Sequence, residues 1–437
     1  MIDEQVRSKV LGTVDSLRDE LVKLVSDTVR IPSVAPLPPS IDPDFEPEWL
    51  GGETRVNQFL QPVMQSFGLE TDLWEEEPGR ANLVGTWRGR GRGRSLILNG
   101  HVDVVSPGSG SLWTVAGPWS GKVIDGRIYG RGSTDMKAGN AAGIYALKAV
   151  LQAGFQPRGD IHIEAVVGDE HMDTDFGVGA TVKRGYRADA AIVMESSAPP
   201  YRFSINTASP GLFLMQVIVR GKATHISMRD ELVRAGGRGA KVGASAIDKA
   251  FLVQQGLLRL EEEWGQTKAH PAFTRPGHFV LYPKYIEGGD LMGASIPDRC
   301  VMVYVVWHAP QDAPEDAERE IREHVARIAQ TDPWLRENPP EVNRIPFYWP
   351  PFDLPPDSPI CQAAAVACEA ALNQPPRFYG AAYTSDATFL NQLGIPTIVL
   401  GPGSIEVAHG YNEYVEIQDI VDAAKIYALT IVEWCGV

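Results

Sequence analysis

The chain has 437 residues, of which 44% are hydrophobic and 22% are charged, and these values exclude a disordered or collagen-like protein. Its formal net charge of −15 repels phosphate backbones and anionic lipid headgroups, so we expect neither a nucleic-acid nor a membrane partner. No run of about 18 apolar residues occurs, and the four cysteines are scattered without CxxC spacing. We therefore expect a cytoplasmic protein with reduced thiols and two or three domains.

The first part of the chain alternates helix and strand patterns. Apolar residues at helical spacing predict an amphipathic helix over 4–30, and the proline-rich stretch 32–47 that follows predicts irregular structure. In chain order we then expect a helix at 54–67, a strand at 95–98, a helix at 138–153 and strands at 161–167 and 190–194. This alternation is typical of an α/β sheet covered by helices.

The pattern changes near residue 211. Strands are expected at 213–219, near Tyr282 and at 301–306, with helices at 244–260 and 314–329. After an expected loop at 334–359, helices at 360–372 and 417–435 and a strand at 397–400 return to the first pattern. We therefore predict a mixed-sheet α/β catalytic domain, 1–210 and 346–437, with an inserted α+β lid or dimerisation domain at 211–345.

One apolar strand ends in the sequence His101-Val-Asp103. Residues two apart on a strand face the same side, so Asp103 could lie behind the His101 ring and orient it as a metal ligand. A purely structural pair is the alternative.

Two further segments place ionisable residues where regular structure begins or ends. Asp135 lies in a glycine-rich approach just before the helix at 138–153, where it is either a metal ligand or a helix N-cap. The strand at 161–167 is followed by Asp169, Glu170 and His171. Such a cluster either faces solvent or holds a cation, because burying it uncompensated is costly.

Together these segments resemble the metallopeptidase family that includes acetylornithine deacetylase, succinyl-diaminopimelate desuccinylase, aminoacylase and the glutamate carboxypeptidases. The resemblance runs from His101 to Glu413 in the family's order. It implies a site for one or two divalent cations per subunit, with Asp135 as the bridging ligand. The implied metal ligands are His101, Asp135, His171, Glu195 and His409.

The position of His171 departs from the family, whose members carry a glutamate ligand there. With His171 as a ligand, Asp135 and Glu195 supply two negative charges, so we expect one metal to bind more weakly. Zinc is the first choice of metal, and manganese, cobalt or nickel are alternatives. The alternative for His171 itself is a solvated side chain beside an unrelated ligand.

The resemblance also implies roles in catalysis. Glu170 would act as the general base on a metal-activated water, with Asp103 supporting His101. His225, in the Gly-x-x-x-His sequence of the inserted domain, would stabilise the oxyanion across a subunit interface. We therefore expect a homodimer or higher homo-oligomer formed through that domain, although His225 could also be an ordinary surface residue.

Two positions that read the substrate in relatives differ here. Ala294 stands where an asparagine is usual, and Trp307 lies in the segment where an arginine is expected. Trp307 could form an aromatic pocket with Tyr282, Tyr285 and Tyr383, or these residues could belong to the core.

The sequence therefore predicts a hydrolase that cleaves the C–N amide bond of a small N-acyl amino acid, dipeptide or related compound. A second hypothesis is an aminohydrolase that releases ammonia from an activated aromatic amine, as 5-nitroanthranilate aminohydrolase does. The third is a non-catalytic binding or scaffold protein, against which the retained set of ionisable residues argues.

Overall fold

The computed structural model describes residues 2–36 and 45–437, so part of the stretch predicted as irregular lies outside the described residues. The chain forms two compact units. Unit 1 comprises Met1–Ala208 and Phe352–Val437, and unit 2 comprises Ser209–Pro351. Unit 2 corresponds to the inserted domain, which the sequence predicted at 211–345.

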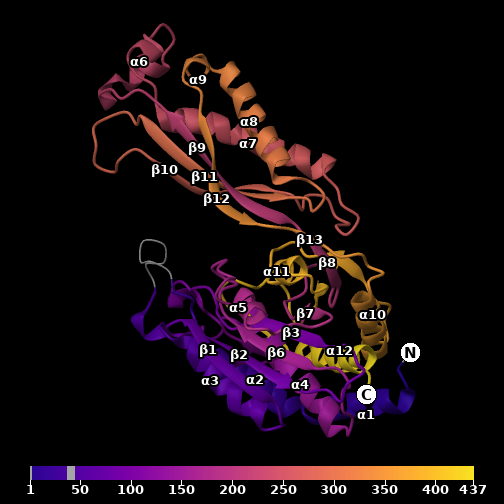
Figure 1. Ribbon diagram of the computed structural model, residues 1–437. Coiled ribbons are helices and arrows are strands. Elements are labelled where there is room, and N and C mark those ends of the chain that lie inside the picture. The colour runs from indigo at the N-terminus through magenta and orange to yellow at the C-terminus, as the bar shows by residue number, and fades with distance from the viewer. Residues whose placement is uncertain (1, 37–44) are drawn as a thin grey trace. The chain divides into compact units, whose positions relative to one another are not determined.

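Unit 1 is built on a mixed nine-stranded sheet (Figure 1) with the order β1-β2-β6-β3-β7-β15-β8-β13, and β14 pairs with β8. Its strands are β1 (Glu70–Glu77), β2 (Arg80–Trp87), β3 (Leu96–His101), β6 (Ile161–Val166), β7 (Ala191–Val193), β8 (Ile205–Ser209), β13 (Phe352–Asp353), β14 (Phe378–Gly380) and β15 (Thr397–Val399). The central strands β6, β3, β7 and β15 run parallel, so their carboxyl ends meet at one edge.

Helices cover both faces of this sheet. They are α1 (Glu4–Ser16), α2 (Arg18–Val29), α3 (Gly52–Gln65), α4 (Ala138–Gln152), α5 (Val178–Lys183), α10 (Pro359–Leu372), α11 (Ala387–Gln392) and α12 (Ile417–Cys435). Leu96 and Leu98 pack in the core beneath α4 and α12, whereas Ile97 packs in a second core with α5 and α11. Because side chains alternate along a strand, β3 is apolar on both faces and central in the sheet.

A smaller sheet ties distant segments of unit 1 together. Its strands are β4 (Lys122–Ile124), β5 (Arg127–Tyr129) and β16 (Tyr414–Glu416), in the order β16-β5-β4. It holds the chain that follows residue 409 beside the chain that precedes residue 135.

Unit 2 is a four-stranded antiparallel sheet with the order β10-β11-β9-β12. Its elements are β9 (Gly211–Arg220), α6 (Arg229–Val233), α7 (Ala246–Thr267), β10 (Leu281–Gly288), β11 (Arg299–His308), α8 (Pro314–Thr331), α9 (Pro333–Glu337) and β12 (Glu341–Trp349). The expected loop at 334–359 was wrong, because β12 pairs with β9 there. Polar residues and Pro346 hid this strand, which lies at an edge of the sheet where proline is tolerated.

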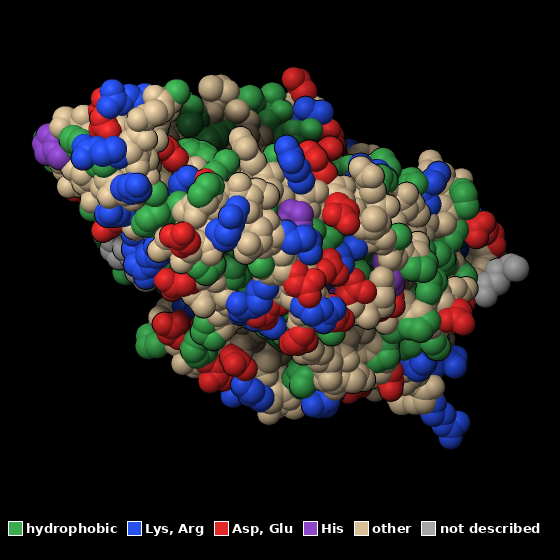
Figure 2. All heavy atoms as spheres, turned by 90° about the horizontal axis from the view of Figure 1, so that it is seen from above, with side chains coloured by type: hydrophobic (Ala, Val, Ile, Leu, Met, Phe, Trp, Pro, Cys, Tyr) green, Lys and Arg blue, Asp and Glu red, His purple; other side chains and the backbone are tan. Residues whose placement is uncertain are grey.

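The helix expected over 4–30 is divided in two at Leu17, which joins α1 to α2. All four cysteines are buried and free. Acidic and basic side chains intermingle on the face drawn in Figure 2, so charge of one sign does not dominate that face. Across the described ranges, no helix combines the length and the apolar character needed to cross a bilayer.

Close packing of α4 against the strand ends yields a test of the fold. A Cβ at Gly139 would lie 2.1 Å from the carbonyl oxygen of Met194, whereas a Cβ at Gly12 in α1 would meet nothing within 4 Å. We expect Gly139→Ala to destabilise the protein by about 1–3 kcal/mol through overpacking.

Gly12→Ala is the matched control, and it should stabilise by about 0.5–1 kcal/mol because alanine favours helix. Chemical denaturation of both variants measures the difference. Equal stability changes would contradict the close approach of α4 to Met194.

Candidate metal centre

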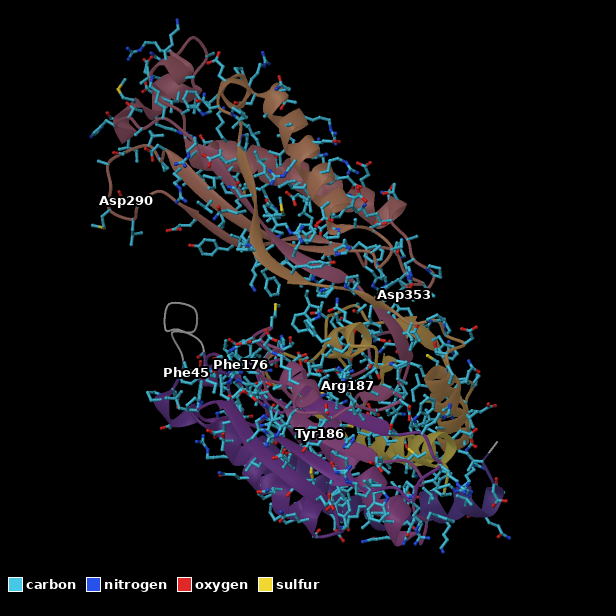
Figure 3. The ribbon with its side chains drawn as sticks, in the orientation of Figure 1. Phe45, Phe176, Tyr186, Arg187, Asp290 and Asp353 are labelled. Atoms are coloured by element: carbon cyan, nitrogen blue, oxygen red, sulfur yellow. The ribbon has the colours of Figure 1, made fainter. Side chains whose placement is uncertain are left out.

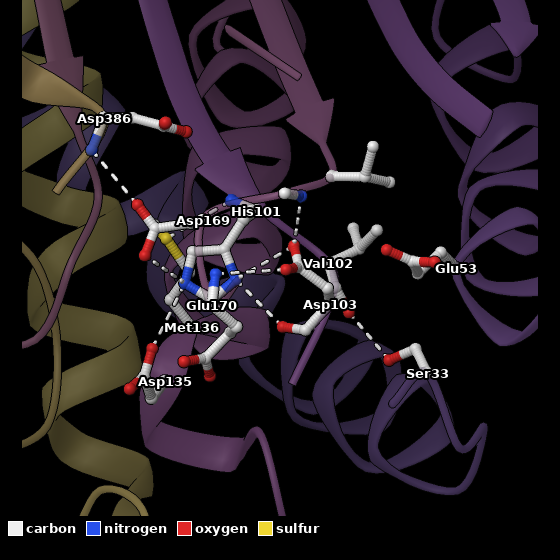
Figure 4. A network of polar contacts seen from close by, with 12 residues as sticks. Ser33, Glu53, His101, Val102, Asp103, Asp135, Met136, Asp169, Glu170 and Asp386 are labelled. Carbon is white, nitrogen blue, oxygen red and sulfur yellow. Dashed lines mark hydrogen bonds and ion pairs between the residues drawn. The ribbon is translucent and has the colours of Figure 1, made fainter. Parts of the chain in front are cut away.

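His101 is the last residue of β3, and its imidazole points at carboxylates (Figure 4). The ring Nδ1 donates to the backbone carbonyl of Asp103 at 2.9 Å. The ring Nε2 lies 2.9 Å from Oε1 of Glu195 and 3.2 Å from Oδ1 of Asp135. A ring fixed in this way presents Nε2 as a donor atom for a metal.

Asp103 supports His101 differently from the expectation. Its backbone carbonyl, not its carboxylate, holds the ring, and the carboxylate Oδ1 is 3.6 Å from Nδ1. The carboxylate instead accepts the backbone N–H groups of Gly168 and Glu170, each at 3.1 Å. Asp103 therefore fixes both the imidazole and the loop that follows β6.

Asp135 lies between two imidazoles. Its Oδ1 is 3.2 Å from Nε2 of His101, and its Oδ2 is 3.1 Å from Nε2 of His409. The helix α4 begins after Lys137 and has no side-chain cap, which excludes the N-cap alternative for Asp135. One carboxylate thus faces two potential metal positions, as a bridging ligand does.

The loop after β6 supplies two carboxylates to the same place. Oε2 of Glu170 lies 3.0 Å from Nε2 of His409, and its Oε1 accepts the backbone N–H of Val105 at 3.3 Å. Oδ2 of Asp169 faces Nε2 of His101 at 3.9 Å, and its Oδ1 accepts the backbone N–H of Asp386 at 3.1 Å.

The described residues form two groups that could each hold a metal ion. One consists of His101, Asp135 and Glu195, and the other of Asp135, Glu170 and His409. In each group the ligand atoms lie within 4.8 Å of one another. Neither group includes His171, which follows Glu170 on the turn, so the geometry differs from the expected ligand set by one residue.

The electrostatics of the centre fit a cation. Burial, together with the neighbouring carboxylate of Asp135, raises the pKa of Glu195 to about 7. Burial likewise lifts the pKa of Asp169 well above its usual range. Several carboxylates are thus buried together with too little positive charge, which divalent cations on oxygen and imidazole ligands would supply.

Asp386 is a residue of this centre that the sequence reasoning missed. It precedes α11 and is 2% exposed, and neither of its carboxylate oxygens has a hydrogen-bond partner among the described residues. Burial raises its pKa to about 8. The run Thr384-Ser385-Asp386 was a usable signal, but it is also what a helix N-terminus looks like.

The remaining candidates lie in different units. His225, Tyr282, Tyr285 and Trp307 belong to unit 2, and His225 is exposed with its Nδ1 accepting the backbone N–H of Ser227. Tyr383 belongs to unit 1, where its hydroxyl donates to the carbonyl oxygen of Ser196 at 2.5 Å, beside Glu195. The expected aromatic pocket and the role of His225 stay predictions.

Comparisons with known proteins show similarity along nearly the whole chain. The family model described as peptidase family M20/M25/M40 matches residues 97–433. The chain is 32% identical to N-formyl-4-amino-5-aminomethyl-2-methylpyrimidine deformylase from Halalkalibacterium halodurans, over 100% of this chain and 99% of that protein. It is 26% identical to succinyl-diaminopimelate desuccinylase from Rhodospirillum centenum, over 94% of this chain and 97% of that protein.

Among solved structures, human carnosine dipeptidase 1 superposes with a TM-score of 0.75 and 15% identity, covering 99% of both chains. This likeness confirms the predicted α/β fold with its mixed sheet. The family match confirms the resemblance drawn from the motifs, and it sets aside the non-catalytic alternative. The chain belongs to the peptidase family M20/M25/M40 and is a hydrolase of that family.

Proposed function

We propose that the centre holds two divalent cations, one in each group, with Asp135 as the shared ligand. The observation that carries this proposal is that the two oxygens of Asp135 face two different imidazoles at 3.2 and 3.1 Å. Asp135, Glu170 and Glu195 supply three negative charges, one more than the set that contains His171. Zinc suits this mixture of imidazole and carboxylate, with manganese, cobalt and nickel as competitors.

We assign the role of general base to Asp169 and the role of ligand to Glu170. Both oxygens of Glu170 already have a contact. Oε2 pairs with Nε2 of His409, and Oε1 accepts the backbone N–H of Val105. Oδ2 of Asp169 stands 3.9 Å from Nε2 of His101, beyond hydrogen-bond distance, and burial raises the pKa of this carboxyl group, as it also does for Glu170. The sequence predicted Glu170 as the base and His171 as the ligand, so in this proposal each role belongs to the preceding residue.

The reaction follows from these positions. Cations bound here would supply the Lewis acidity that makes water nucleophilic and polarises an acyl oxygen near neutral pH. Asp169 takes one proton from the attacking water, whose oxygen bonds to the acyl carbon. The C–N bond then breaks, and Asp169 returns the proton to the leaving nitrogen, which departs as the amine while the acyl group leaves as a carboxylic acid.

For the substrate we propose an N-formyl derivative of an aminomethyl-substituted aromatic heterocycle. The relative that is 32% identical over the full length carries the name of a deformylase for such a pyrimidine. Ala294 and Trp307, in place of a polar amide and a cation, suit a substrate without a carboxylate, because that substrate offers a ring to stack on.

The expected homodimer stays a prediction, and unit 2 offers support for it. The edge strand β10 exposes Tyr282, Tyr285 and Ile286. The loop after it, marked by Asp290 in Figure 3, carries Leu291 and Met292, which are 98% and 92% exposed. A second copy of this chain would remove this apolar surface from water. The cytoplasmic location likewise stays a prediction.

Metal binding should depend on pH. In the metal-free protein, the neighbouring carboxylates of Glu170 and Asp135 raise the pKa of His409 to about 11, because their attraction for the imidazolium exceeds the lowering of the pKa by burial. A cation must displace that proton, so we expect affinity to rise with pH across the neutral range, with proton release on binding. Calorimetry in buffers of different ionisation enthalpy measures this release, and binding without proton release would contradict the ligand role of His409.

The assignment of base and ligand predicts opposite phenotypes for two neighbours. Asp169→Asn should keep both metal equivalents and lower turnover by about 10²–10⁴-fold, because the proton carrier is removed. Glu170→Gln should weaken one equivalent, because it removes a charged ligand. Metal analysis of dialysed protein, together with kcat, separates the two variants. The reverse pattern would restore Glu170 as the base.

A substrate panel tests the proposed reaction. Metal-reconstituted enzyme should release formate and amine from N-formyl-4-amino-5-aminomethyl-2-methylpyrimidine. We expect a kcat/KM at least about 100-fold above those for N-acetylornithine, N-succinyl-diaminopimelate and dipeptides, since their carboxylates meet no dedicated reader.

Two other results would decide against this proposal. Preference for an N-acyl amino acid would return the substrate to the class expected from the sequence. Release of ammonia in place of formate would favour the aminohydrolase hypothesis.

A further inference from the structure

Glu413 lies outside both metal-binding groups, yet it contacts the segment that carries Asp135. It is 0% exposed, and its Oε1 accepts the backbone N–H of Thr134 at 2.9 Å and of Asp135 at 3.4 Å. Its Oε2 forms an ion pair with Nη1 of Arg131 at 2.5 Å, and the Arg131 side chain is also buried. One carboxylate therefore binds the turn Ser133–Lys137 directly and the chain before it through Arg131.

The backbone of Glu413 fastens the same two segments. Its carbonyl oxygen accepts the N–H of Gly130 at 2.9 Å. From the next residue onward, β16 pairs with β5, with Tyr414 opposite Tyr129. The chain after residue 409 is thus joined to the chain before Asp135 by side-chain and main-chain bonds together.

The chain before His409 is attached through the N–H groups of Ser404, which donates to Oγ1 of Thr134 at 3.1 Å, and of Ile405, which donates to the carbonyl oxygen of Ser197 at 3.0 Å. A second attachment lies on the C-terminal side of His409. The His409 side chain is 53% exposed, and its backbone adopts a φ of +59°, a left-handed conformation that residues other than glycine rarely take. The next anchor is Asn412, which bonds to Val115 and Thr114 in an exposed loop. Glu413 is therefore the buried attachment on the C-terminal side of the loop that presents the His409 imidazole.

We propose that Glu413 is a positioning residue for one metal site, the group of Asp135, Glu170 and His409. It sets the separation between Asp135 and His409, which come from distant parts of the chain and must meet around one ion. The other group shares Asp135 but takes its other two members, His101 and Glu195, from the ends of β3 and β7, so it depends less on Glu413. This inference rests on the proposed two-metal function.

The test compares two double variants on the same small sheet. Arg131→Met with Glu413→Leu removes the buried pair without leaving a lone buried charge, so the fold should persist. Arg127→Met with Glu416→Leu is the matched control, since that pair joins β5 and β16 at 2.8 Å but is exposed and lies away from Asp135. Circular dichroism and thermal unfolding of the metal-free proteins verify folding.

Calorimetric titration with Zn²⁺ and the absorption spectrum with Co²⁺ report the two sites without any measure of activity. We expect the wild type and the control to bind two equivalents. The Arg131/Glu413 variant should retain one equivalent and bind the other about 10–100-fold more weakly, the effect typical of lost outer contacts at a metal site. Adding His409→Ala to this variant should cause no further loss at the retained equivalent.

The outcomes are distinct. A wild type that binds no metal would defeat the proposed function, and this inference with it. A folded Arg131/Glu413 variant that binds both equivalents normally, or loses both equally, would overturn the positioning role alone. If that variant does not fold, Glu413→Gln takes its place, since it keeps the shape and one acceptor but removes the charge that pairs with Arg131. Normal affinity for both equivalents in that variant would also overturn the inference.

Discussion

The structure of unit 1 depends on one electrostatic constraint, the convergence of buried carboxylates at the carboxyl ends of parallel strands. Asp135, Glu170 and Glu195 approach two imidazoles within about a hydrogen-bond length. Asp169 and Asp386 lie beside them. Like charges cannot be buried together without compensation, and two imidazoles do not balance this number of acids. Divalent cations would remove the imbalance, and the other features of the centre serve to hold their ligands in place.

Several candidate ligands lie in loops that buried carboxylates restrain. The carboxylate of Asp103 accepts two peptide N–H groups from the loop after β6, while its carbonyl oxygen orients His101. Glu413 does the same for the turn around Asp135. Such contacts limit side-chain and backbone freedom before any ion binds, so less conformational entropy is lost on binding.

The residues considered for metal binding and those predicted to contact the substrate fall in different units. Every member of the two metal-binding groups lies in unit 1, whereas His225, Ala294 and Trp307 lie in unit 2. The proposal of an aromatic substrate rests in part on Trp307, which lies in the segment where an arginine was expected.

The sequence by itself determined the α/β fold, because the alternation of helix and strand patterns follows from local periodicity. The insertion was predicted from a change in that pattern, and the candidate ligands from resemblance to a known family. His101, Asp135, Glu195 and His409 stand in motifs short enough to be recognised without a structure. Strand β12 was missed because its polar edge face resembles a loop.

Only the tertiary structure decided where the consecutive side chains of one turn lie, with Asp169 facing His101 and Glu170 facing His409. Asp169, Glu170 and His171 are all ionisable and follow one strand, so the residue pattern without the family resemblance does not distinguish them. A turn projects successive side chains in different directions, and its orientation is set by distant bonds from Asp103, Val105 and Asp386. The buried positions of Asp386 and Glu413 likewise depend on chain segments far apart in sequence, so no local pattern could have revealed their contacts.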